Sequence, residues 1–115
     1  MTALERSAWV VVCERQDLVA GGGVCALLGN EQVALFYLPQ EDCEVYALAN
    51  RDPIGKANVL SRGIVGDIGG QLVVASPLYK QHFSLESGVC LEDERIRIPV
   101  YAVRLDGDSV LLAQP

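Results

Sequence analysis

The apolar residues of this chain come in runs of strand length, and that feature limits its fold more than any other. Val, Ile, Leu and Tyr form short segments that Gly, Asp, Asn or Pro interrupts, as in all-β proteins. Apolar residues at helical spacing are hard to find, and the best helical candidate, Glu14–Leu18, is at most a turn or two long. The sequence therefore predicts an all-β fold.

We expect strands at the following segments: Trp9–Cys13, Val24–Leu28, Gln32–Leu38, Val45–Ala49, Ile64–Val65, Gln71–Ala75, Arg95–Ile98, Tyr101–Leu105 and Val110–Leu112. Gly29-Asn30 and Asp106–Asp108 predict tight hairpin turns, because Gly, Asn and Asp tolerate positive φ. Asp67–Gly70 predicts another turn. Charged and apolar residues alternate in Arg95–Ile98, as they do in a strand with one face in water.

The length and the continuity of this pattern predict one domain. At 115 residues the chain can bury one core, and it contains no repeat and no segment with the composition of an interdomain linker. We expect a single domain over residues 1–115, with loosely ordered ends at residues 1–6 and 113–115.

Charge and hydropathy argue against several classes of function. The net charge is −6 and the 9 Lys and Arg residues form no run, which argues against binding to nucleic acid or to an anionic membrane. Residues 1–9 lack the basic start and the long apolar stretch of a signal peptide, and no apolar run is long enough to span a bilayer. We expect a cytoplasmic protein.

The 4 cysteines are scattered and include no C-x-x-C pair: Cys13, Cys25, Cys43 and Cys90. In a cytoplasmic chain this arrangement is typical of reduced thiols rather than of disulfides or a zinc site. Cys13 and Cys25 lie in apolar β-like runs, where we expect them to be buried. We expect no disulfide-linked partner.

Two segments rich in Pro and Gly interrupt the strand pattern, at residues 50–67 and 75–90. Functional groups of small β-folds lie on such loops. The second segment resembles a cluster-binding loop of Rieske proteins, C-P-x-H-G-x-x-F: Pro77 and Phe83 fall on its Pro and Phe, and Gly88–Cys90 resembles the residues that follow. The first segment resembles the other loop of that family, N-x-C-P-H, at three positions: Asn50, Arg51 and Pro53.

The resemblance implies a Rieske-like antiparallel β-sandwich or barrel with two loops in the cluster-binding positions, but the ligands differ. The family's four ligand positions hold other residues here: Asp52, Ile54, Ser76 and Tyr79. Lys80 replaces the loop glycine. A Rieske centre needs two thiolates and two imidazoles, and the whole chain has 1 histidine, His82. We expect neither a cluster nor another metal on this chain.

Longer strings resemble a narrower family, the small subunit of assimilatory NAD(P)H-dependent nitrite reductase. They are residues 59–67, 75–81 and 88–93, together with Trp9 and Val33–Phe36, and the similarity runs from about Trp9 to Val110. The resemblance implies an accessory subunit of an oxidoreductase of nitrate assimilation, which pairs with a large subunit. It also implies that the large subunit holds FAD, an iron–sulfur cluster and siroheme, and reduces nitrite to ammonium with NAD(P)H.

The chain itself shows no catalytic residue, and we expect it to be inactive in isolation. Asp52 and Asp67 stand beside Pro and Gly and are expected to be turn residues, and Cys90 is expected to be a buried small residue. Residues on and beside the two loops are candidates for docking the large subunit: Arg51, Tyr79, Lys80, Gln81 and His82. The alternative for Tyr79 is that it fills the volume vacated by the cluster.

Two other functions are open at this point. A free-standing β binding module would use the two vacant loops as a small-ligand pocket. A Rieske-type ferredoxin would carry electrons to an oxygenase, but it requires ligands that this chain lacks, and the purified protein would contain iron and acid-labile sulfide.

Overall fold

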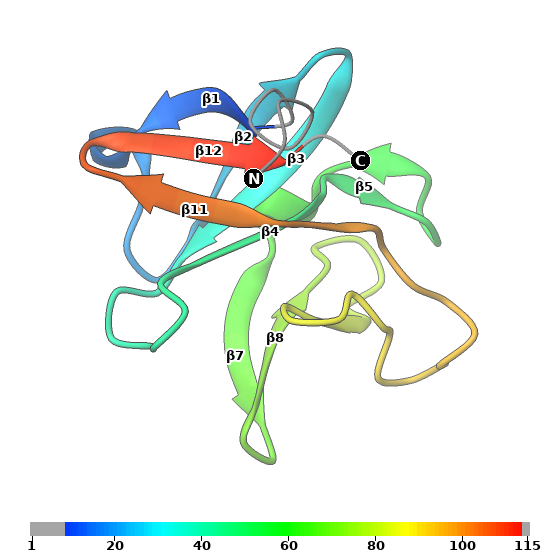
Figure 1. Ribbon diagram of the computed structural model, residues 1–115. Coiled ribbons are helices and arrows are strands. Elements are labelled where there is room, and N and C mark those ends of the chain that lie inside the picture. Colours follow the sequence, from blue (N-terminus) through cyan, green and yellow to red (C-terminus); the bar gives the residue numbers. More distant parts are fainter. Residues whose placement is uncertain (1–8, 114–115) are drawn as a thin grey trace.

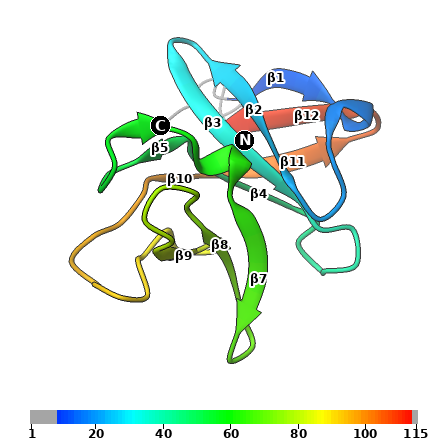
Figure 2. The same ribbon diagram turned by 180° about the vertical axis from the view of Figure 1, so that it is seen from behind.

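The computed structural model describes residues 9–113 and confirms an all-β fold. The strands form four sheets, and every pair of neighbouring strands in them is antiparallel. Figures 1 and 2 show these sheets from opposite sides.

The sheets are defined by their strand order and bounds. The first has the order β1-β12-β11, with bounds Trp9–Glu14, Ser109–Ala113 and Val103–Asp106. The second has the order β10-β4-β3-β2, with bounds Val100–Tyr101, Val45–Ala49, Glu31–Tyr37 and Gly23–Leu28. The third has the order β7-β8-β9, with bounds Ile64–Ile68, Gln71–Ala75 and His82–Ser84. The fourth is a short hairpin of β5 and β6, Arg51–Asp52 and Ala57–Asn58.

The second sheet is shared by two hydrophobic clusters, because its central strand β3 is buried on both faces. Val33 and Leu35 belong to the cluster that faces the first sheet, and Ala34 and Phe36 belong to the cluster that faces the third. Successive side chains of a strand point to opposite faces. The continuous apolar run Val33–Phe36 is therefore what this doubly covered strand requires.

The predicted turns are confirmed. Gly29 has φ +61° between β2 and β3, and Gly107 has φ +59° between β11 and β12. At the β7–β8 turn, the N–H of Gly70 donates to Oδ1 of Asp67 at 2.8 Å, so Asp67 is a turn residue as predicted.

The segment Arg95–Ile98 is not the strand that its alternation predicted. Arg97 forms one isolated bridge with Val89. The carboxylate of Asp93 accepts hydrogen bonds from the backbone N–H and the guanidinium of Arg95, which favours a turn at this point. Ile98 is nevertheless buried in the core and Arg97 is exposed to solvent. The alternation of apolar and charged residues therefore predicted which side chains are buried, although the backbone is not a strand.

Three short strands were not predicted from the sequence: β5, β6 and β9. Each has two or three residues and depends on a partner that the fold supplies.

The expected helix is a single 3₁₀ turn, Arg15–Asp17, and a second 3₁₀ turn, Leu60–Arg62, follows β6. No helix among residues 9–113 is long and apolar enough to cross a membrane. Of the ends expected to be loosely ordered, residues 1–6, 114 and 115 lie outside the described residues, and Ala113 ends β12.

Candidate functional site

Two loops that are far apart in the sequence meet at one end of the molecule. Loop A comprises residues 50–58 and contains the β5–β6 hairpin, and loop B comprises residues 76–81 between β8 and β9. Figures 1 and 2 show the β5–β6 hairpin at the opposite end from the turn between β11 and β12. The two loops contact each other directly.

Loop A is fixed to the core by Asn50, which is buried directly after β4. The side-chain nitrogen of Asn50 donates to Oε1 of Gln32 at 3.1 Å, and its backbone N–H donates to the carbonyl oxygen of Gln32 at 2.9 Å. The N–H groups of Ser61 and Leu60 donate to the side-chain and backbone oxygens of Asn50, at 2.7 and 3.0 Å. Asn50 thus ties together the two ends of loop A.

Asp52 organises the turn of loop A from a fully buried position, with an exposed fraction of 0%. Its Oδ1 accepts hydrogen bonds from the N–H groups of Ile54 at 2.8 Å and Gly55 at 3.1 Å. Its Oδ2 accepts a hydrogen bond from the hydroxyl of Ser76 in loop B. A buried carboxylate needs such partners. The predicted turn role is confirmed, and the bond to Ser76 is an addition that the sequence did not indicate.

Ser76 is the corresponding anchor of loop B and is also buried. Its hydroxyl donates to Asp52 and accepts from the N–H of Leu78 at 3.3 Å. Its carbonyl oxygen accepts from the N–H of Lys80 at 3.0 Å, and its own N–H donates to the carbonyl oxygen of Gln81 at 2.9 Å. Ser76 therefore holds loop B closed and attaches it to loop A.

The loops also touch at Gly55 and Leu78. A Cβ atom placed on Gly55 would lie 2.2 Å from Cδ1 of Leu78, so glycine allows this close approach. The contact and the bond between Asp52 and Ser76 hold the loops against each other. This arrangement does not favour a small-ligand pocket between the loops.

Loop B presents its central residues to solvent. Leu78 is 43% exposed and Tyr79 is 64% exposed, so the side chain of Tyr79 does not fill a buried volume. Lys80 has φ +62°, a left-handed conformation that residues with a Cβ rarely adopt. The Rieske pattern has glycine at this position, and the positive φ is the physical reason for that glycine.

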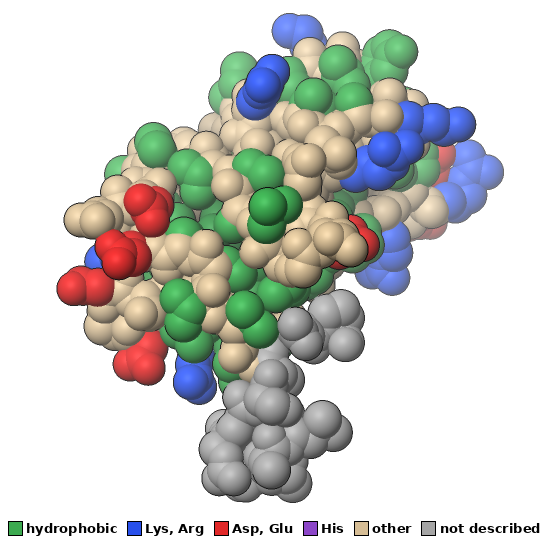
Figure 3. All heavy atoms as spheres, turned by 90° about the horizontal axis from the view of Figure 1, so that it is seen from above, with side chains coloured by type: hydrophobic (Ala, Val, Ile, Leu, Met, Phe, Trp, Pro, Cys, Tyr) green, Lys and Arg blue, Asp and Glu red, His purple; other side chains and the backbone are tan. Residues whose placement is uncertain are grey.

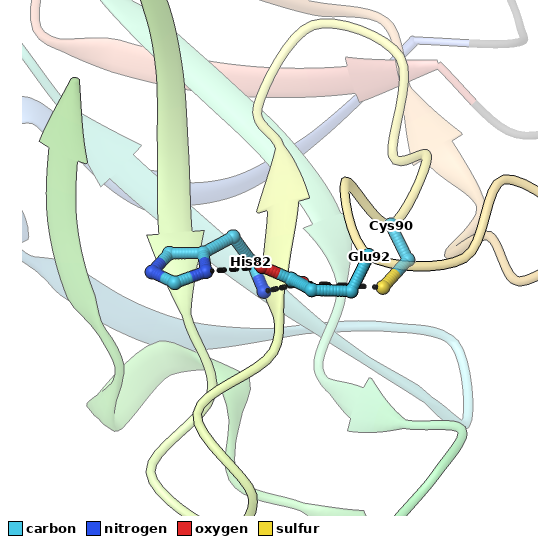
Figure 4. Close-up of polar contacts among 3 residues, drawn as sticks. All are labelled: His82, Cys90 and Glu92. Carbon is cyan, nitrogen blue, oxygen red and sulfur yellow. Dashed lines mark hydrogen bonds and ion pairs between the residues drawn. The ribbon is translucent and has the colours of Figure 1, made fainter. Parts of the chain in front are cut away.

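His82, the first residue of β9, is bound to Glu92 (Figure 4). The Nδ1 atom of His82 lies 2.7 Å from Oε2 of Glu92, and the backbone N–H of His82 donates to Oε1 of Glu92 at 2.7 Å. The thiol of Cys90, which is buried as predicted, donates to the same Oε1 at 3.6 Å. Because the carboxylate lies between thiol and imidazole, these residues do not form a nucleophile–base pair.

The carboxyl of Glu92 has a lowered pKa. Desolvation by its surroundings opposes ionisation, but the backbone N–H and side chain of His82 outweigh this effect, with a smaller contribution from the Cys90 thiol. Together they hold the pKa of Glu92 below its usual value. Glu92 is thus a charged anchor for the segment that follows β9.

The other candidate docking residues are Arg51 of loop A and Gln81 of loop B. Arg51 is exposed and lines a cavity of about 240 Å³ together with Arg97. Gln81 is half-buried, and its side-chain oxygen has no hydrogen-bond partner among the described residues. The sequence did not indicate Arg97 or Glu92, because their positions depend on which segments the fold brings together.

All of the cysteines are free thiols in the structure. Cys13 is half-buried, and desolvation together with the nearby carboxylate of Asp17 raises the pKa of its thiol. Cys25, which was expected to be buried, is exposed because it lies on β2, the edge strand of the second sheet.

Comparison with known proteins identifies relatives that cover almost the whole chain. Residues 8–113 match the family described as the Rieske-like [2Fe-2S] domain. The chain is 45% identical over 106 residues to the nitrite reductase (NADH) small subunit of Salmonella typhimurium. This match covers 92% of this chain and 97% of the Salmonella protein. The solution structure of the nitrite reductase [NAD(P)H] small subunit from Erwinia carotovora matches with a TM-score of 0.78 at 43% identity, over 95% of this chain and 83% of that one.

A further match is to part of a much longer protein. The chain is 37% identical over 108 residues to the nitrite reductase [NAD(P)H] large subunit of Klebsiella oxytoca. The match covers 94% of this chain but 11% of that protein.

The residues at the family's ligand positions do not fit an iron–sulfur cluster. Asp52 and Ser76 bond to each other, Ile54 offers no donor atom, and Tyr79 lies on the exposed tip of loop B. Such clusters are held by thiolates or imidazoles. Within residues 9–113, no group of three or more His, Cys, Asp or Glu side chains is arranged to hold a metal ion. The donor set in the loops therefore does not fit an iron–sulfur cluster.

Proposed function

Because this chain belongs to the Rieske-like [2Fe-2S] domain family, and within it to the nitrite reductase small subunits, we propose that it is an accessory subunit of an NAD(P)H-dependent nitrite reductase. The observation that carries the proposal is the identity of 45% over 97% of the Salmonella typhimurium small subunit. The complete enzyme reduces nitrite to ammonium in the cytoplasm, as a step of nitrate assimilation.

The partner in this proposal is the nitrite reductase large subunit. The match to 11% of the Klebsiella oxytoca large subunit supports this pairing, because a domain that occurs inside one chain and as a separate chain elsewhere serves the same assembly.

We assign all of the cofactors to the large subunit. FAD, an iron–sulfur cluster and siroheme lie there, and this chain carries none of them. The donor set supports this assignment, because Asp52, Ser76, Ile54 and Tyr79 offer iron neither a thiolate nor an imidazole. The isolated chain is accordingly inactive, and its contribution is to bind and stabilise the large subunit.

The two loops form the docking surface in this proposal, with these residues at or beside the contact: Arg51, Tyr79, Lys80, Gln81 and His82. Loop B is held at its base by Ser76, so its tip is presented in one conformation. An exposed tyrosine on a rigid loop contributes contact area at small entropic cost, and tyrosine is enriched at the centres of interfaces. The 64% exposure of Tyr79 supports docking over the alternative of cavity filling.

The two rival functions have less support. The contact of loops A and B disfavours the small-ligand pocket that a free-standing binding module would place there. The donor set disfavours a Rieske-type ferredoxin, whose electron-carrying centre needs ligands that these loops do not offer.

Co-purification tests the proposal. The chain is expressed with the large subunit from the same organism, as wild type and as the Tyr79→Ala and Leu27→Ala variants. Leu27 is 63% exposed on β2, in a different sheet from loop B, and is a matched control for loss of exposed apolar surface. We expect wild type and Leu27→Ala to co-purify with the large subunit, and Tyr79→Ala to bind about tenfold more weakly.

Two results would count against the proposal at different levels. Unchanged binding by a folded Tyr79→Ala variant would remove loop B from the interface. A wild-type chain that does not associate with the large subunit at all would refute the role as its subunit.

A further inference from the structure

The cationic side chains of this acidic chain are distributed unevenly. The net charge is −6, yet Lys and Arg gather at one end of the face in Figure 3, and most carboxylates on that face lie at the other end. The carboxylate end surrounds the 3₁₀ turn after β1: Glu14, Asp17, Glu44 and Asp108 lie around Arg15 there. On this face of the molecule, the cations and most of the carboxylates therefore lie at opposite ends.

The basic end coincides with the two loops. Lys56 lies on the turn of loop A, and Lys80 lies on loop B, two residues after the Leu78 that touches Gly55. Arg51 of loop A shares a cavity with Arg97. Lys56 and Lys80 therefore lie on the two loops that touch at Gly55 and Leu78, and Arg51 and Arg97 line the cavity beside loop A. We name these four cations the basic rim: Arg51, Lys56, Lys80 and Arg97.

The basic rim has no ion pairs among the described residues. The ion pairs of the structure join Arg15 to Glu44, His82 to Glu92 and Arg95 to Asp93, so none of the four rim cations takes part. Glu31 lines the same cavity as Arg51 and Arg97, without pairing with either. In a chain with an excess of carboxylates, an unpaired cluster of cations leaves positive potential available to a partner.

Two of the rim cations hold an unfavourable backbone conformation. Lys56 has φ +57° and Lys80 has φ +62°, and they are the only non-glycine residues with positive φ within residues 9–113. Glycine would adopt this conformation without steric cost. Lysine therefore occupies both positions at a cost in folding free energy.

We infer that the basic rim and the apolar tip of loop B together dock an acidic surface of the large subunit, which approaches by electrostatic steering. This inference rests on the proposed function and adds the chemistry of the partner's surface. The exposed side chains of Leu78 and Tyr79 form the apolar centre of the contact, from which water is removed on binding. The cations of the basic rim orient the large subunit as it approaches and raise the association rate. The partner face then carries Asp and Glu side chains around an apolar patch.

A second copy of this chain is a weaker candidate for the occupant. Two chains of net charge −6 repel each other overall.

Association kinetics test the inference. The purified chain is mixed with the complete large subunit of the same organism, and the association rate is measured at NaCl concentrations from about 50 to 500 mM. The variants are Lys80→Glu and, as a control with the same change in charge, Arg104→Glu. Arg104 lies on β11 over the ring of Trp9, away from both loops.

We expect the wild-type association rate to fall steeply as salt rises, because added ions screen the attraction. Lys80→Glu should associate about tenfold more slowly at low salt and lose most of the salt dependence, while Arg104→Glu behaves like wild type. Circular dichroism of each variant checks that the fold is intact, and Lys80→Gln replaces Lys80→Glu if the latter does not fold.

The outcomes separate this inference from the proposed function. A complex that forms at a rate independent of salt, or equally fast with Lys80→Glu, overturns the acidic partner surface and leaves the subunit role standing. The absence of any complex overturns both. Concentration-dependent self-association of the chain alone, abolished by Lys80→Glu, would assign the basic rim to a second copy instead.

Discussion

Asp52 and Ser76 lie 24 residues apart and form the one side-chain bond that joins the two loops. Both are buried, so neither group can exchange its partner for water. At the positions where the Rieske pattern has its two cysteines, the chain thus has a hydrogen-bonded pair. The pair holds the loops together without iron.

Removal of the Ser76 hydroxyl should destabilise the fold. The Ser76→Ala variant leaves Oδ2 of Asp52 buried with one fewer donor, at a cost of about 1–3 kcal/mol in the free energy of unfolding. Ser61→Ala is the control, because the Ser61 hydroxyl makes no hydrogen bond among the described residues, and it should cost less than about 0.5 kcal/mol. Urea denaturation measures both. Equal stability of the two variants would contradict a structural role for the bond.

Substitutions at Lys80 separate backbone strain from charge. Lys80→Gly and Lys80→Ala remove the same charge, but glycine has no Cβ to resist the φ of +62°. Lys80→Gly should be more stable than Lys80→Ala by about 1 kcal/mol. At Gln71, an exposed position in β8, the order should reverse, with alanine more stable than glycine. Thermal unfolding of the four variants checks this, and the same order at both positions would exclude strain at Lys80.

Glu92 should make stability depend on acid pH. Its pKa is lower in the folded chain than in the unfolded chain, so its contribution is present above the unfolded pKa of about 4.3 and is lost as pH falls through the folded value. The difference in unfolding free energy between wild type and Glu92→Gln should therefore be larger at pH 7 than at about pH 3. Glu94→Gln, at an exposed neighbouring position, is the control for removal of a carboxylate from this segment. If the difference in unfolding free energy between wild type and Glu92→Gln stays constant with pH, the hydrogen bonds from His82 do not stabilise the charged form of Glu92.

The sequence predicted single residues well where the cause is local. Asp67 and Asp52 bind N–H groups two or three residues away, and their position beside Gly or Pro is a sufficient signal. The bond of Asp52 to Ser76 and the pair of His82 and Glu92 were not predicted, since each joins segments whose proximity depends on the whole fold.

At the scale of elements, the segment after β9 is held against the irregular segment that precedes β10 by a close backbone contact. Gly88 has φ +78°, and a Cβ atom there would lie 2.0 Å from the carbonyl oxygen of Ile98. The N–H of Ile98 donates to the carbonyl oxygen of Gly88 at 2.8 Å. Only glycine satisfies both the conformation and the approach.

The Gly88→Ala variant should consequently be far less stable than Gly107→Ala. Both positions have positive φ, but a Cβ at Gly107 meets nothing within 4 Å, so that variant carries only the conformational cost. We expect Gly88→Ala to lose at least about 2 kcal/mol more than Gly107→Ala, because a backbone atom cannot move aside easily. Urea denaturation again gives the comparison, and similar losses would mean that the Ile98 segment can shift.

Elements were predictable where the side-chain pattern and the turn residues agree. β4 and β8 were predicted with the observed bounds, and the hairpin turns at Gly29 and Gly107 were found because their glycines stand between apolar runs. β9 was missed because three residues carry too little pattern. Arg95–Ile98 was misassigned because alternation records burial, and an irregular segment lying on a core can alternate as well.

At the scale of the whole molecule, the fold brings the proposed docking residues to one end. Hydrophobic clusters cover both faces of β3, and the two loops lie at the end opposite the turn between β11 and β12. The Rieske resemblance had singled out these two loops in the sequence. It did not indicate that the cations would gather there, because Arg51, Lys56, Lys80 and Arg97 are dispersed along the chain.

The central claim is that this chain serves its enzyme without a cluster of its own. The most direct test is the iron and acid-labile sulfide content of the chain purified alone under anaerobic conditions, measured beside the complete complex. We predict no stoichiometric iron or sulfide and no nitrite reduction by the chain alone, while the complex contains both and is active. An isolated chain that binds iron and sulfide in cluster stoichiometry, with the matching visible absorbance, would contradict the claim.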